Sequence, residues 1–213
     1  MAKEARPHFD PAKHHRRSIR IKGYDYAQTG AYFVTIVTSQ RDCLFGEIVA
    51  GEMVLSDFGK IAEACWRAIP EHFPAVELGA YVIMPNHVHG IIIIDESVGT
   101  RRADDVGTGA FGRGAALLRP YMRPNESFPD ESRPNVKPGS LGAIVRSYKS
   151  AVSYRIRKEH NTTEIWQRNY YEHIIRDDKD LQRITDYINT NPLRWNEDDE
   201  NPIKARPVPP ENS

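Results

Sequence analysis

Two histidines separated by one valine are the residues of this chain best suited to chemistry. His87 and His89 lie in the segment 84–90, and four isoleucines follow it. Because the side chains of a β-strand alternate between its two faces, both imidazoles would project from the same side of a sheet. Two imidazoles on one face can bind one divalent metal ion, and a rigid apolar strand would hold them in place. Spacing alone leaves the alternative open that both are hydrogen-bonded structural histidines.

A tyrosine and an asparagine near the C-terminal end form a second pair. Tyr187 and Asn191 are four residues apart in a segment whose pattern predicts a helix at about 178–190, ended by Pro192. At that spacing both side chains point the same way. The phenol is a potential nucleophile, and the amide oxygen is a potential ligand of a hard divalent cation. Packing of the tyrosine and a helix-end role of the asparagine are the structural alternatives.

Composition restricts the partners of the chain less than the distribution of its charges does. Its 213 residues contain 29 Lys plus Arg and 29 Asp plus Glu. Basic residues exceed acidic ones by seven to two in residues 1–22 and by five to one in residues 141–160. Either stretch could contact phosphate, although a solvated tail or an ordinary helix face would show the same excess.

The sequence gives no sign of secretion or of a membrane span. It has two cysteines and no CxxC motif, an N-terminus without an apolar leader, and no apolar run of membrane-spanning length. We therefore expect a cytoplasmic protein that has no membrane partner.

Alternating and helical patterns predict the elements that must position these residues. The expected strands are at 32–38, 44–55 (a strand or short hairpin), 76–84, 87–95 and 166–175, and the expected helices are at 57–69, 141–159 and 178–190. Ser56, Ser140 and Asp177 are the expected helix N-caps. This order predicts an α+β sandwich, in which an antiparallel sheet is covered by helices on one face.

Three segments carry no such pattern. We expect residues 1–22 to be a basic flexible arm, residues of about 96–139 to be a flexible insertion, and residues 200–213 to be a tail. Residues 23–199 would then form one domain.

Two blocks of sequence carry a family resemblance. The first is Ala-Tyr-Val-Ile-Met-Pro-Asn-His-Val-His-Gly at 80–90, and the second is Trp-Gln-Arg-Asn-Tyr-Tyr-Glu-His-Ile-Ile-Arg at 166–176, followed by Asp180, Tyr187 and Asn191. In this order they resemble the single-tyrosine HUH transposases of the insertion-sequence type, in particular those associated with repetitive extragenic palindromes (REP-associated tyrosine transposases). The resemblance covers about residues 24–95 and 139–196.

The resemblance implies a ferredoxin-like fold, a reaction and its residues. Tyr187 would be the catalytic tyrosine of a metal-dependent single-strand DNA endonuclease and strand transferase, which forms a 5′-phosphotyrosine intermediate at hairpin DNA. His87 and His89 would bind Mg²⁺ or Mn²⁺. Asn191 stands where insertion-sequence members have a longer glutamine, so it would bind the metal directly or through water. The protein would be nucleoid-associated, and it would act as a monomer or a homodimer.

Other tyrosines and other functions compete with this assignment. Tyr148, Tyr154, Tyr170 and Tyr171 all lack an amide one helical turn away at a helix end. A histidine-triad nucleotide phosphohydrolase would require a third histidine at position 91, where Ile91 stands. A palindrome-binding protein without catalysis is the third alternative. Contacts to the DNA backbone are expected from five basic residues, which are Arg146, Lys149, Arg155, Arg168 and Arg176, with Trp166 stacking on a base or packing in the core.

Overall fold

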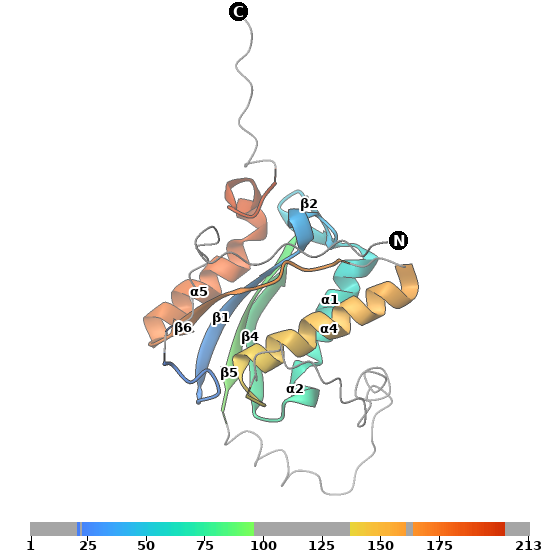
Figure 1. The fold of residues 1–213 in the computed structure, drawn as a ribbon. Coiled ribbons are helices and arrows are strands. Elements are labelled where there is room, and N and C mark those ends of the chain that lie inside the picture. Colours follow the sequence, from blue (N-terminus) through green and yellow to red (C-terminus); the bar gives the residue numbers. More distant parts are fainter. Residues whose placement is uncertain (1–20, 22, 96–136, 161–163, 203–213) are drawn as a thin grey trace, which may run out of the picture.

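A four-stranded antiparallel sheet forms the centre of the computed structural model, which describes residues 21, 23–95, 137–160 and 164–202 (Figure 1). The sheet has the order β4-β5-β1-β6. Its strands are β1 (Gly30–Val37), β4 (Val76–Ile83), β5 (His87–Ile94) and β6 (Tyr171–Ile175). A separate hairpin joins β2 (Gly46–Val49) and β3 (Glu52–Leu55). The helices are α1 (Asp57–Arg67), α2 (Ile69–His72), α4 (Leu141–His160) and α5 (Asp178–Thr190), with the 3-10 turns η1 (Ser39–Arg41) and η4 (Pro192–Glu197).

The connections of this sheet are those of a ferredoxin-like fold. The order β1-α1-β4-β5-α4-β6 is a split βαβ arrangement in which β5 lies between β1 and β4. The hairpin β2–β3 is inserted before α1, and α5 is added after β6. The predicted α+β class and its antiparallel sheet are therefore confirmed.

Helices cover both faces of the sheet, whereas the sequence pattern predicted helices on one face only. α1 and α4 pack on one face, and α5 lies across the other (Figure 1). The reason is that the isoleucine run of β5, residues 91–94, is apolar on both sides. Ile92 belongs to the main core under α1 and α4, while Ile91 packs with Ile184 and Ile188 of α5.

Local sequence signals begin the two helices that matter most. The Ser56 hydroxyl accepts a hydrogen bond from the Gly59 amide at 3.1 Å, which caps α1. The Asp177 carboxylate accepts one from the Asp180 amide at 2.8 Å, which caps α5. Both N-caps agree with the prediction, because a side-chain oxygen satisfies an amide that the helix itself leaves unpaired.

Some predicted boundaries differ from the structure. The expected strand at 166–175 is regular only in β6, while Trp166 makes an isolated bridge with Thr38. Most of the expected arm at 1–22 and of the expected insertion at about 96–139 lies outside the described residues, which omit 1–20, 22 and 96–136. Asn201, in the segment expected to be a tail, is 2% exposed.

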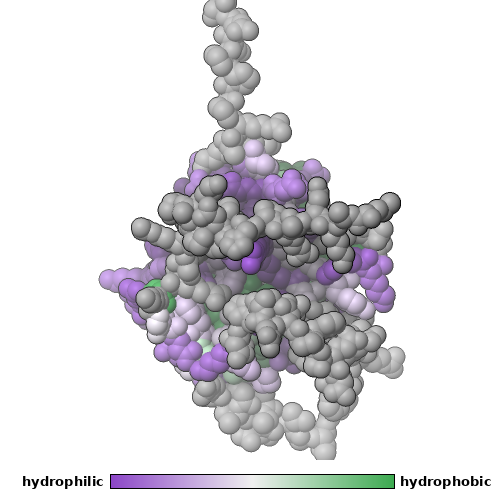
Figure 2. Space-filling view, viewed as in Figure 1, coloured by the Kyte–Doolittle hydropathy of each residue, from purple (hydrophilic) through white to green (hydrophobic). Residues whose placement is uncertain are grey.

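The surface and the helices of the described chain give two general findings. Figure 2 shows mainly hydrophilic side chains on the coloured surface, with small hydrophobic areas between them. Among the helices of the described ranges, none has the length and apolar character needed to cross a membrane.

Candidate active site

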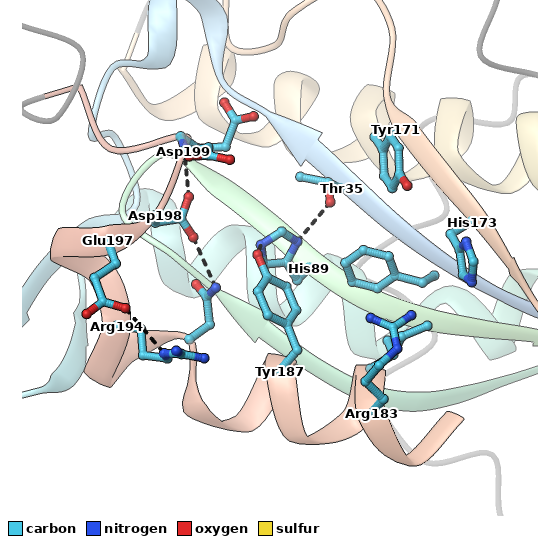
Figure 3. Close-up of a pocket in the computed structure, with 14 residues that line it drawn as sticks. Thr35, His89, Tyr171, His173, Arg183, Tyr187, Arg194, Glu197, Asp198 and Asp199 are labelled. Atoms are coloured by element: carbon cyan, nitrogen blue, oxygen red, sulfur yellow. Dashed lines mark hydrogen bonds and ion pairs between the residues drawn. The ribbon is translucent and has the colours of Figure 1, made fainter. Parts of the chain in front are cut away.

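The predicted tyrosine and His89 of the predicted histidine pair line a pocket of about 570 Å³ on the α5 side of the sheet. The Tyr187 hydroxyl lies 3.1 Å from Nε2 of His89, although 98 residues separate the two in the chain. Tyr187 projects from α5 and His89 from β5 toward the middle of the pocket (Figure 3). The Phe33 ring stacks on the His89 ring, with centroids 5.3 Å apart. The Phe33 and Tyr187 rings meet edge to face, with centroids 6.1 Å apart. These contacts fix the phenol beside the imidazole.

Both imidazoles are buried and are oriented by a neighbour. His87 is fully buried and His89 is 3% exposed. Nδ1 of His87 lies 2.8 Å from the Asn86 side-chain oxygen, and Nδ1 of His89 lies 2.9 Å from the Thr35 hydroxyl. Each Nδ1 therefore has a polar partner, which leaves Nε2 of His89 beside the Tyr187 hydroxyl and Nε2 of His87 buried 3.9 Å from Oδ2 of Asp198. Such partners orient imidazoles that bind metal ions in proteins.

A buried aspartate completes this cluster. Asp198 follows η4 and is 8% exposed. One ligand atom each from His87, His89 and Asp198 lie within 4.8 Å of one another. Asn191 donates a hydrogen bond from Nδ2 to Oδ2 of Asp198 at 3.0 Å, and the Glu200 amide donates one to Oδ1 at 2.7 Å. The carboxylate is thus held against the two imidazoles.

Polar atoms of this cluster fit a divalent cation. Nε2 of His87 and Oδ1 of Asn191 are buried and have no hydrogen-bond partner among the described residues. Burial lowers the pKa of His87 to about 3 and lowers that of His89 well below its ordinary value, so both rings are neutral at pH 7. Neutral imidazoles and a carboxylate are the donors that such ions bind. The donor set therefore has the chemistry of a metal site.

The nucleophile candidate is protonated in this environment. Burial is the main reason that the pKa of Tyr187 rises to about 12, and the negative charge of Asp198 adds to it, while the Asn191 amide acts in the opposite direction. A phenol with this pKa is a weak nucleophile at pH 7, so positive charge beside it is needed to favour phenolate.

The structure brings together four of the predicted site residues and adds one that the sequence analysis missed. His87, His89, Tyr187 and Asn191 lie in one cluster. Asp198 was missed because it lies beyond the last helix, outside any periodic pattern. The acidic run at 197–200, two residues after Trp195, is the sequence signal that pointed to it.

The five predicted DNA-contacting residues are distributed over different surfaces. Arg146, Lys149 and Arg168 line a second pocket beside α4. Arg155 is half-buried and forms a hydrogen bond with the Cys65 thiol of α1. Arg176 is exposed at the end of β6 and lines neither pocket.

Comparison with known proteins identifies two relatives in Haemophilus influenzae. An uncharacterised protein is 41% identical over 190 residues, which cover 89% of this chain and 95% of the relative. A protein named as a candidate REP-associated tyrosine transposase is 27% identical over 172 residues, which cover 80% of this chain and 74% of the relative. No protein-family model matches the chain.

A solved structure supports the fold. The structure of a REP-associated tyrosine transposase bound to a REP hairpin matches 84% of this chain and 74% of its own, with a TM-score of 0.50 and 17% identity.

Proposed function

Because this chain belongs to one family with the 41% identical Haemophilus influenzae protein and is similar to the REP-associated tyrosine transposases, we propose that it is a metal-dependent single-strand DNA endonuclease and strand transferase. One observation carries this proposal. The Tyr187 phenol, whose oxygen lies 3.1 Å from Nε2 of His89, stands beside a buried cluster of His87, His89 and Asp198.

The residues of the cluster have distinct roles in this proposal. His87, His89 and Asp198 would hold the ion, with Asn191 beside them as a further oxygen donor or as the group that positions Asp198. When bound there, Mg²⁺ or Mn²⁺ would supply Lewis-acid polarisation of a phosphate oxygen. Mg²⁺ suits the oxygen donors, while two imidazoles favour Mn²⁺.

Tyr187 performs the covalent step. Its phenol loses the proton, its oxygen bonds to phosphorus, and the bond from phosphorus to the 3′ oxygen breaks. That oxygen takes up a proton and leaves as a 3′-hydroxyl, while the 5′ side of the strand stays on the tyrosine. The phosphodiester energy is kept in the linkage, so another 3′-hydroxyl can attack later and rejoin strands. A half-exposed phenol in an open pocket permits this exchange, since Tyr187 is 40% exposed.

Hairpin DNA is the substrate that the relatives suggest. The structural neighbour was solved with a REP hairpin, and a sequence relative bears the same family name. A DNA substrate favours a cytoplasmic, nucleoid-associated protein. The fold and the intact His87, His89 and Tyr187 favour cleavage over binding alone.

Adduct formation tests the proposal directly. Hairpin oligonucleotides with single-stranded flanks, drawn from palindromic repeats of the genome that encodes the chain, are incubated with protein and Mn²⁺, and covalent adduct is measured on denaturing gels. We expect adduct with the wild type and none with Tyr187→Phe. Tyr171→Phe is the matched control, because Tyr171 is the other tyrosine that lines the pocket. EDTA should abolish the adduct. Adduct from Tyr187→Phe, or loss of adduct only in Tyr171→Phe, would reassign the nucleophile.

A further inference from the structure

A second pocket lies on the other side of the sheet from the active site. It has a volume of about 360 Å³ and is formed by α4 and by the segment 166–170 that leads into β6. The segment is fixed to the helix, because Nε1 of Trp166 donates to the Lys149 carbonyl at 3.1 Å. The α4 face that lines the pocket carries Gly142, Val145, Arg146, Lys149, Ser153 and Arg157.

The charge of this pocket is of one sign. Arg146, Lys149, Arg157 and Arg168 line it, and no carboxylate is among the described residues that do so. The Lys149 ammonium donates only to carbonyl oxygens there, to Gln167 at 2.6 Å and to Asn169 at 3.1 Å. Burial lowers the pKa of Lys149 to about 8, which leaves it charged at neutral pH. Cations gathered in this way repel one another, so an anion in the pocket would be stabilised.

Aromatic rings and hydroxyl groups accompany the cations. Trp166 and Tyr170 line the pocket beside Ser150 and Ser153. Basic side chains that bind phosphate, combined with aromatic rings that stack on bases, are the features of single-strand nucleic-acid sites. The volume is at the small end of ligand pockets, which span about 300–1,000 Å³, and therefore suits one nucleotide and not a duplex.

The chain itself connects this pocket to the active site. Trp166, Arg168 and Tyr170 line the second pocket, whereas Tyr171 and His173 line the active-site pocket. Successive residues face opposite sides because the segment becomes the strand β6. β6 is an edge strand of the sheet, so a DNA strand that passes round this edge would reach both pockets.

We propose that the second pocket binds one unpaired nucleotide of the DNA that is cleaved in the active-site pocket. Arg146 and Arg168 contact its phosphate groups, and Tyr170 with Trp166 takes its base. The nature of the substrate rests on the proposed function, but the binding site does not use Tyr187 or the metal cluster.

Binding to an uncleaved probe tests this site. In a Tyr187→Phe background, fluorescence anisotropy is measured with the hairpin oligonucleotide that carries single-stranded flanks. We expect Arg146→Glu and Arg168→Glu each to weaken binding at least about tenfold, since each replaces a phosphate contact by a like charge. Lys158→Glu is the matched control, because Lys158 is exposed on the same helix and does not line the pocket. In addition, Arg168→Ala should make the slope of log affinity against log salt concentration less negative by about 0.7. Equal affinities for all the glutamate variants would overturn the proposal.

A scan of abasic positions tests the base. Single nucleotides of the probe are replaced in turn by an abasic residue. We expect one unpaired position at which the loss of the base weakens binding about tenfold or more, and Tyr170→Ala should remove the penalty at that position alone. A probe without a sensitive position, or a penalty that Tyr170→Ala leaves unchanged, would overturn it. The adduct assay reports separately on the proposed function, since Arg168→Glu with Tyr187 intact should still form adduct at saturating protein.

Discussion

At the scale of single residues, hydrogen bonding of Asn86 determines which nitrogen of His87 can bind a metal. The Asn86 Nδ2 group donates to two main-chain carbonyls, that of Arg41 at 3.0 Å and that of Glu200 at 2.7 Å. Its oxygen is therefore the acceptor for Nδ1 of His87, which must carry the proton. Nε2 then bears the lone pair, and this nitrogen is the buried one without a partner in the described chain.

Loss of the Asn86 side chain should weaken metal binding, because Asn86 keeps the proton of His87 on Nδ1 and leaves Nε2 free to bind the metal. We expect Asn86→Ala to reduce Mn²⁺ affinity by about 10–100-fold, the usual effect of removing a group that orients a ligand histidine. Calorimetric titration of the folded protein measures it. Asn196→Ala is the control, because Asn196 is exposed. Unchanged Mn²⁺ affinity in Asn86→Ala would show that His87 does not depend on this bond.

Asp198 should contribute its negative charge to the cation site. Asp198→Asn keeps the shape of the side chain and an oxygen that can accept from Asn191, but it removes the charge. We expect Mn²⁺ binding to fall by at least about tenfold, because a hard cation prefers carboxylate over amide oxygen. Asp199→Asn makes the same change of charge at an exposed neighbour and should bind Mn²⁺ nearly as the wild type does. An equal decrease of Mn²⁺ affinity in both variants would mean that the net negative charge near the site, and not ligation by Asp198, determines the affinity.

At the scale of elements, β5 serves the active site on one face and the core on the other. Gly90 follows His89 and faces the Trp66 ring of α1, where an added Cβ would lie 2.2 Å from Cζ2. We expect Gly90→Ala to lower the free energy of unfolding by about 1–3 kcal/mol, because the buried indole must move. Denaturant unfolding measures the change. In a Trp66→Phe background, Gly90→Ala should lower the free energy of unfolding by less. An equal decrease in both backgrounds would mean that the added methyl group does not act through the Trp66 ring.

The elements also show what the sequence could predict. Alternation in β5 correctly placed His87 and His89 on one face, and helix periodicity correctly placed Tyr187 and Asn191 on one side of α5, because both rules depend on neighbours in the chain. The face of the sheet that α5 covers was not predictable, because β5 has isoleucines on both of its sides and either face could have been covered. Asp198 was not predictable either, since it lies against His87, which is far from it in the chain.

At the scale of the whole molecule, one sheet separates two pockets whose charged residues differ. The active-site pocket is lined by the carboxylates of residues 197–200 together with Arg183 and Arg194, and the second pocket contains only cations among its described charged residues. Sequence counts gave a balanced net charge and could not show this division. The basic excess of 141–160 was evident, but only the fold separates Arg146 and Lys149, which line a pocket, from Arg155, which contacts Cys65.

Two buried neutral imidazoles should make the stability of the whole metal-free protein fall with acidity. The pKa of His87 is lowered to about 3 and that of His89 well below its ordinary value, in both cases mainly by burial. In the unfolded chain each histidine has a pKa of about 6.5, so below that pH the unfolded state binds protons that the folded state excludes. The free energy of unfolding therefore decreases as pH falls from about 6.5 toward 3, by about 2 kcal/mol per imidazole between pH 7 and 5.

Denaturant unfolding in EDTA at pH 7 and pH 5 measures this loss. His89→Gln should show about half the decrease of the wild type, because one buried imidazole no longer titrates on unfolding. His72→Gln is the control, since His72 is exposed and its replacement should leave the full decrease. A His89→Gln protein with the decrease of the wild type would mean that His89 is already protonated in the folded state, which is incompatible with its role as a neutral metal ligand.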